Sequence, residues 1–107
     1  MKIEDFNNKQ FDIFGTVFTI KLVDTLDEDN KLLHYGLTEG NTKEIRISKE
    51  VMKAKQPDSE LYVTLVHEII HTVLDTGQYL EESQKEPLVE WLARCIISLL
   101  NQDILCI

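Results

Sequence analysis

Hydrophobic and polar positions follow different periods in the two halves of this chain. From Phe11 to Phe14 and from Thr16 to Val23, β-branched and aromatic residues dominate, and Gly15 separates the two segments. In the second segment, residues of alternating positions share a face, which is the period of a strand. We expect the two segments to form an antiparallel pair or one bent strand.

Two further segments also have the period of strands. His34 to Thr38 lies between polar turns, and from Thr42 to Ser48 isoleucine alternates with charged and polar residues. The second of these segments has one polar face, so we expect it to lie at an edge of the sheet. From Ser48 to Lys55 a short helix is expected, and the Gln56-Pro57 pair would end it, because a residue before proline is pushed out of the helical region.

The second half of the chain is predicted to be helical. One helix should run from Asp58 or Ser59 to Gly77. A last helix should extend from about Glu82 to about Ile104, and Pro87 must fall in its first turn, which places its true start near Ser83 to Glu86. The order of elements predicts an α+β fold, with a small antiparallel or mixed sheet of three to four strands packed on these two helices.

Composition adds limits to this picture. With 107 residues the chain is expected to form a single domain, residues 1–107, around one modest core. Its net charge of −8 argues against nucleic acid as a partner. The sequence has neither a signal-peptide pattern nor an apolar run long enough for a membrane span, so we expect a cytoplasmic protein. Cys95 and Cys106 are interpreted as small core residues rather than as a disulfide or a metal pair.

The central helix carries an H-E-x-x-H motif formed by His67, Glu68 and His71. Histidines four residues apart on a helix project from the same face, where their ring nitrogens can bind one metal ion. Glu68 lies beside them and would act as the general base that takes a proton from the attacking water and returns it to the leaving amine. The apolar residues of this helix fill the opposite arc, so the three residues form one polar stripe.

A catalytic zinc site needs a third protein ligand and an open position. No histidine follows His71, so the third ligand should be a carboxylate on the last helix. Glu86 and Glu90 stand four apart there and share a face. Either can be the ligand, and the other would then orient a histidine by accepting its second ring N–H.

Four other residues have weaker claims to a role. Asp75, one turn beyond His71, can accept an N–H from it, although an isolated Asp near a helix end is more often simply exposed. His34, Tyr35 or Tyr79 can donate a hydrogen bond to the oxyanion of the reaction, although tyrosines more often serve packing. Trp91 is interpreted as part of the core.

The segments VTLVHEIIHTVLDTG (Val63 to Gly77) and EPLVEWLARCI (Glu86 to Ile96) resemble the small zinc metallopeptidase-like proteins of phages and mobile elements, which are distantly similar to the ImmA/IrrE peptidases. The resemblance implies a gluzincin-like Zn²⁺ site in which a glutamate of the later helix completes two histidines. It also places the ligand before the supporting acid, so it ranks Glu86 above Glu90. A peptide or protein substrate, such as a cytosolic regulator, would be consistent with this family.

Three functions therefore compete. The first is a zinc metallopeptidase in which the segment Thr42 to Ser48 pairs with an extended substrate. The second is a non-catalytic zinc-binding interaction module of phage or mobile-element origin, which would contact a partner through Lys43 or Arg46 on the same strand. The third is a domain that binds no metal.

Overall fold

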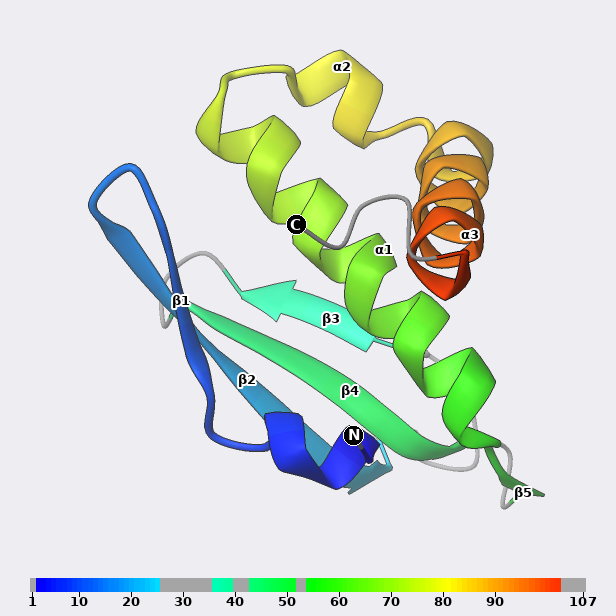
Figure 1. Cartoon of the computed structure of the whole chain (residues 1–107). Coiled ribbons are helices and arrows are strands. Elements are labelled where there is room, and N and C mark those ends of the chain that lie inside the picture. Colours follow the sequence, from blue (N-terminus) through cyan, green and yellow to red (C-terminus); the bar gives the residue numbers. More distant parts are fainter. Residues whose placement is uncertain (1, 26–35, 40–42, 52–53, 103–107) are drawn as a thin grey trace.

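The structure, a computed structural model, describes residues 2–25, 36–39, 43–51 and 54–102. These residues form a mixed sheet and a set of helices (Figure 1). The strands are β1 (Gln10–Ile13), β2 (Thr16–Thr25), β3 (Gly36–Glu39), β4 (Glu44–Val51) and β5 (Ala54–Lys55). The helices are the 3₁₀ turn η1 (Ile3–Phe6), α1 (Asp58–Thr76), α2 (Leu80–Ser83) and α3 (Glu86–Asn101). The α+β class expected from the sequence is confirmed.

The sheet has the strand order β1-β2-β4-β3, and β5 pairs with β4. β1 and β2 form an antiparallel pair, the first of the two arrangements that the sequence left open, and the turn between them places Phe14 and Gly15 at positive φ, +49° and +95°. β2 pairs in parallel with β4, while β3 pairs antiparallel with it. The sheet is therefore mixed, and its parallel pair requires the chain to cross over between β2 and β4.

The expectation that Thr42 to Ser48 forms an edge strand is wrong. Its described part belongs to β4, which lies between β2 and β3 in the middle of the sheet. Ile45 and Ile47 are fully buried, and Ser48 is 1% exposed. Alternation shows which face of a strand is buried, but it does not show how many neighbours the strand has, and here both sides of β4 are paired.

The helix expected from Ser48 to Lys55 is also wrong. β4 continues to Val51, and the short β5 returns alongside it, so that Glu50 faces Lys55 in the register. β2 is ten residues long and pairs with β4 as far as Glu50. Backbone groups of the described residues of this segment therefore have a neighbouring strand as partner, which outweighs a weak local preference for a helix.

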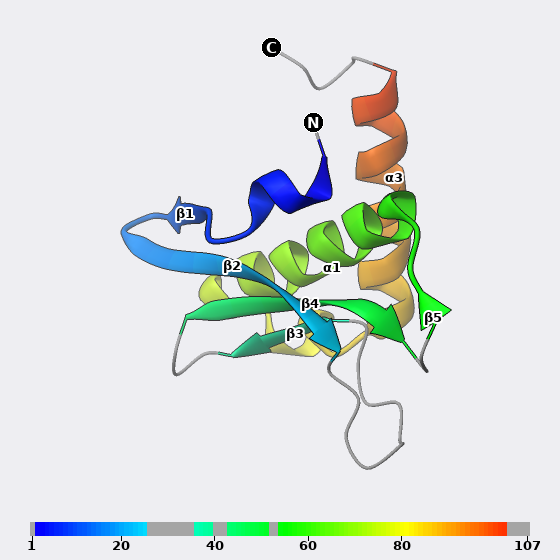
Figure 2. The same ribbon diagram turned by 90° about the horizontal axis from the view of Figure 1, so that it is seen from below.

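The core lies between the sheet and α1, which crosses one face of the sheet (Figure 1). Six buried apolar residues make up its centre: Ile3, Ile20, Ile45, Ile47, Leu61 and Leu65. α3 packs on α1, through Val89 and Ala93, which are both fully buried (Figure 2). α1 lies between the sheet and α3. One of its faces packs on the sheet and a second on α3, which leaves a third face available for a site.

α3 starts at Glu86 with Pro87 in its first turn, within the range that the proline predicted. Trp91, expected in the core, is 66% exposed. The outer face of α3 is as apolar as its inner face, and the contact with α1 decides which of them is buried. Cys95 is a free, half-buried thiol, and Cys106 lies outside the described residues. No helix in the described residues is both long and apolar enough to cross a membrane.

Candidate metal centre

α1 carries the H-E-x-x-H residues near its middle. The helix begins directly after Pro57, and at its end the Gly77 N–H donates to the carbonyl of Val73. Its buried apolar residues face the core, with Leu61 and Leu65 3% exposed, whereas Val73 near the end of the helix is 49% exposed. The polar stripe of the helix therefore faces the side where α3 begins, as the 3.6-residue period requires.

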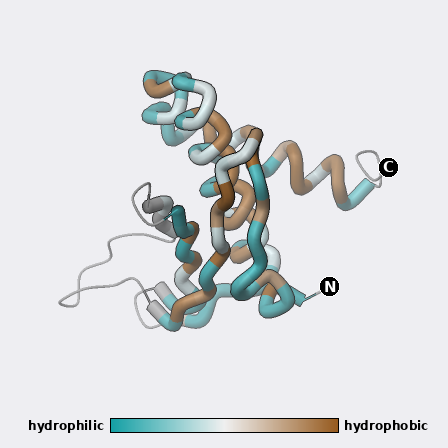
Figure 3. The backbone as a smooth tube through the Cα atoms, turned by 90° about the vertical axis from the view of Figure 1, so that its left-hand side faces the viewer, coloured by the Kyte–Doolittle hydropathy of each residue, from teal (hydrophilic) through white to brown (hydrophobic). Residues whose placement is uncertain are grey.

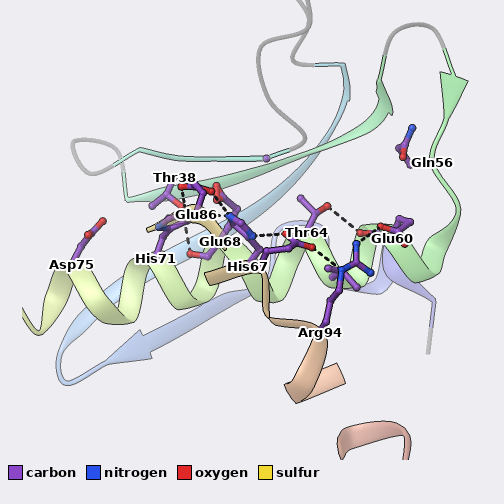
Figure 4. A pocket seen from close by; sticks show the side chains of 13 residues that line it. Thr38, Gln56, Glu60, Thr64, His67, Glu68, His71, Asp75, Glu86 and Arg94 are labelled. Atoms are coloured by element: carbon purple, nitrogen blue, oxygen red, sulfur yellow. Dashed lines mark hydrogen bonds and ion pairs between the residues drawn. The ribbon is translucent and has the colours of Figure 1, made fainter. Parts of the chain in front are cut away.

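His67, His71 and Glu86 converge on one point (Figure 4). The Nε2 atoms of the two histidines lie 3.1 Å apart. Glu86 places Oε2 at 2.9 Å from His67 Nε2 and Oε1 at 2.9 Å from His71 Nε2. The three residues form a group that could hold a metal ion, since their ligand atoms lie within 4.8 Å of one another.

The second ring nitrogen of each histidine has its own partner. His67 Nδ1 lies 2.8 Å from Glu90 Oε2, and His71 Nδ1 lies 3.0 Å from the Ser83 hydroxyl oxygen. Glu90 thus takes the supporting position foreseen for one of the two glutamates. Partners of this kind fix the orientation of an imidazole and leave its other nitrogen to bind a metal.

Ser83 was not found by sequence reasoning. It is 6% exposed at the end of α2, a single turn that the sequence pattern merges with the last helix. A serine near a helix start is usually taken for a cap, so no local signal separates it from many others. Only the position of α2 against α1 identifies its contact with His71.

A carboxylate oxygen and a second imidazole nitrogen crowd around Nε2 of His67. A carboxylate at Nδ1 makes that nitrogen the donor, so in a neutral ring Nε2 carries a lone pair. Glu86 Oε2 lies 2.9 Å from this nitrogen and His71 Nε2 lies 3.1 Å from it, and the tautomer of His71 decides whether its Nε2 donates or accepts. A bound metal ion would offset the repulsion between this lone pair and the carboxylate of Glu86.

Glu68 lies beside these three residues and is 5% exposed. Its Oε2 has no hydrogen-bond partner among the residues that the structure describes. Burial raises the pKa of Glu68 to about 7; His67 lowers it, and Glu86 and Asp75 raise it further. A carboxyl group with a pKa near neutrality can both accept and return a proton at physiological pH.

These residues line an open cleft of about 1010 Å³. Gly36 and Thr38 of β3 form one side of it, and Glu86, Glu90 and Arg94 of α3 form the other. The cleft follows the polar stripe of α1, whose side chains point into it (Figure 4). A cleft of this size can hold a segment of extended peptide or a ligand of similar bulk.

Arg94 ties the two helices together beside the site. Its Nε lies 3.0 Å from Glu90 Oε1, and its terminal NH2 lies 3.3 Å from Glu60 Oε2. The hydrogen bond and charge of Glu60, followed by Glu90, raise the pKa of the Arg94 guanidinium. The four-residue spacing of Glu90 and Arg94 in the sequence is typical of an ion pair on one helix face. The contact of Arg94 with Glu60 of α1 has no such local signal.

The remaining sequence candidates do not join the group. Asp75 lines the cleft and is exposed, while the His71 nitrogen that it was expected to contact faces Ser83 instead. Tyr79 is 59% exposed and is not among the cleft residues. His34 and Tyr35 lie outside the described residues.

Comparison of this chain with known protein families, with curated proteins and with solved structures finds no match. The case for a function therefore depends on the geometry of the site.

Proposed function

We propose that this protein is a zinc-dependent metallopeptidase with His67, His71 and Glu86 as metal ligands and Glu68 as general base. One observation carries the proposal: three ligand atoms converge beside a buried carboxyl group whose Oε2 has no partner among the described residues, within an open cleft. Each part has an ordinary structural explanation, but their combination matches the needs of metal-assisted hydrolysis.

Zinc is favoured by the donor set. Two imidazole nitrogens and one carboxylate oxygen are the ligands found at hydrolytic zinc sites, which leave a further position open. When bound, the ion would polarise a carbonyl group and acidify a water molecule. The side chain of Glu86 is 63% exposed, so one side of the group opens into the cleft.

Glu68 is suited to move the proton. It follows His67 directly on α1, and its burial keeps water from competing for its carboxyl oxygens. As a base it would take the proton of the attacking water, and as an acid it would pass the proton to the leaving amine. Thr38 and Thr72 both donate to the Glu68 backbone carbonyl, at 3.5 and 3.0 Å, and so hold this turn of the helix in place.

The substrate is proposed to be an extended peptide lying against β3. This strand pairs with β4 on one side only, and no strand covers its other side in the described part of the chain. Gly36 and Thr38 of β3 also line the cleft, so a peptide paired with the strand would pass the ligand group. In this proposal β3, and not the segment Thr42 to Ser48, is the strand that pairs with the extended substrate.

The decisive test is Glu68→Gln, with Glu81→Gln on exposed α2 as the matched control. Zinc content is measured by mass spectrometry, and hydrolysis with a mixture of fluorescence-quenched peptides of random sequence. We expect Glu68→Gln to keep its zinc and lose about 10²- to 10⁴-fold in rate, because the base is removed while the ligands stay. The control should keep both properties.

The other outcomes each contradict part of the proposal. Cleavage that survives Glu68→Gln rules out this mechanism. Zinc binding by the unmodified protein without cleavage of any peptide indicates the non-catalytic interaction module instead. Less than about a tenth of an equivalent of zinc after mild purification indicates the domain that binds no metal.

A further inference from the structure

The outer face of α3 carries a regular apolar stripe that the site does not use. Leu88, Leu92, Cys95 and Leu99 follow one another at intervals of four, three and four residues. Trp91 lies next to them on the same face of the helix. Spacing of this kind is the seam by which one helix packs against another.

Apart from the half-buried Cys95, this stripe is exposed in the folded chain. Leu88, Leu92 and Leu99 are 36% to 39% exposed, and Trp91 is the most exposed of the group. Figure 3, coloured by hydropathy, shows apolar stretches along the part of α3 that projects from the body. Figure 2 shows the same end of α3 extending past α1. Val89 and Ala93 already satisfy the contact of α3 with α1, so the stripe faces away from it.

Charge distinguishes the two faces of α3. The charged residues of this helix, Glu86, Glu90 and Arg94, all lie at the cleft, and the outward stripe contains none. In a chain with a net charge of −8, a face without charge is where two copies can approach with the least repulsion.

The size of the stripe fits one side of a small dimer interface. The four most exposed outward residues present roughly 400 Å² of apolar surface, within the range of patches that are often functional. Because about 60% of the area of an interface is apolar, an apolar patch of this size corresponds to an interface of roughly 700 Å² on each partner. Standard interfaces bury about 800 Å² per partner, so the contact would be at the weaker end.

We infer that the outward stripe of α3 binds the same stripe of a second copy of this chain, forming a two-fold symmetric helix pair. A repeated apolar seam is self-complementary, so each copy supplies both the side chains and the spaces between them. The inference does not rest on the proposed peptidase function, because the metal-ligand group lies on the opposite face of α3. Both clefts would remain open in the dimer.

Trp91 gives a direct test, because it is the only tryptophan of the chain. The mass of the protein is followed by sedimentation from about 1 µM to about 1 mM, the range over which a weak interface forms. Tryptophan emission is recorded at the same concentrations. We expect the mass to double while the emission shifts to shorter wavelength and becomes harder to quench with acrylamide, because the indole enters a dry contact.

Leu92→Glu should prevent this association, with Asn101→Glu as the matched control. Both variants add one negative charge to an exposed position of α3, but Asn101 lies on the side of the helix away from the stripe. We expect Leu92→Glu to raise the dimer dissociation constant at least about a hundredfold, since an unpaired charge would be buried in each copy. Asn101→Glu should associate like the unmodified chain.

Circular dichroism of both variants shows whether α3 remains folded. If Leu92→Glu fails to fold, the sedimentation and emission of the unmodified chain still decide the matter. A constant monomer mass at the highest concentration contradicts the inference, as does a folded Leu92→Glu variant that remains dimeric. A doubled mass without any change in tryptophan emission would place the contact on another surface and would also contradict it.

Discussion

At the scale of single residues, Glu68 links the stability of the fold to pH. Its pKa is about 7 in the folded chain, above the ordinary value of 4.5, chiefly because of its burial. Between these values the folded state keeps a proton that the unfolded state has released. Stability therefore falls as pH rises through this range, in the absence of metal.

Glu68→Gln should remove this dependence, because the amide has no proton to lose. With a chelator present, we expect the unmodified chain to lose about 2 kcal/mol more unfolding free energy than the variant between about pH 5 and about pH 7.5. Urea unfolding at both pH values measures the difference, in which the other titrating groups largely cancel. Equal losses in both proteins would mean that Glu68 is ionised at low pH.

At the scale of elements, the spacing between β3 and α1 sets the depth of the cleft. A Cβ atom added to Gly36 would lie 2.8 Å from Thr64 Cγ2 and 2.9 Å from Glu68 Cγ, closer than real Cβ contacts. Glycine is therefore needed here because two elements approach closely, and not because of a positive φ. The same approach lets Thr38 reach the backbone of Glu68.

Gly36→Ala should push β3 away from α1. We expect a loss of about 1 to 3 kcal/mol in unfolding free energy, measured by chemical denaturation. If the proposed peptidase function holds, peptide hydrolysis should also slow, because Glu68 is displaced. Thr64→Ser removes the nearest methyl group and keeps the hydroxyl that donates to the Glu60 carbonyl. In that background Gly36→Ala should cost clearly less, and an unchanged cost would show that the methyl contact is not the cause.

At the scale of the whole molecule, the group formed by His67, His71 and Glu86 joins α1 to α3. Besides Val89 and Ala93, the contact between these helices depends on polar links to His67 and His71 and on the ion pair of Arg94 with Glu60. A bound ion would connect the two helices through its ligands, and any ion that binds only the folded state raises its stability.

Zinc at about one hundred times its dissociation constant should add about 3 kcal/mol to the unfolding free energy. Glu86→Gln should abolish most of this gain, because a ligand is lost. Glu90→Gln should weaken zinc binding only by about 10- to 100-fold, since it removes support from His67. Thermal unfolding with and without zinc measures this gain for the unmodified chain and for both variants. If Glu90→Gln loses more of the gain than Glu86→Gln, Glu90 is the ligand and Glu86 supports the histidine.

The sequence by itself determined the helix that carries the site and the residue types of the metal group. The four-residue spacing of His67 and His71 places them on one face of any helix, because the backbone geometry is fixed. The strand segments before and after Gly15 and the start of α3 near Pro87 followed from similarly local rules, whereas the sequence left open whether these segments form an antiparallel pair or one bent strand. These features depend on neighbours in the chain, which a pattern records directly.

Only the tertiary structure decided which strand lies at the edge, which face of α3 is buried, and which groups support the histidines. β4 was placed at the edge and Trp91 in the core because alternation and helical period identify faces, but not the neighbours that cover them. The contacts of Ser83 with His71 and of Gly36 with α1 join segments that are distant in the sequence, so no local pattern predicted them. Contacts between elements depend on how the whole chain shares its limited apolar surface, and no local pattern contains that information.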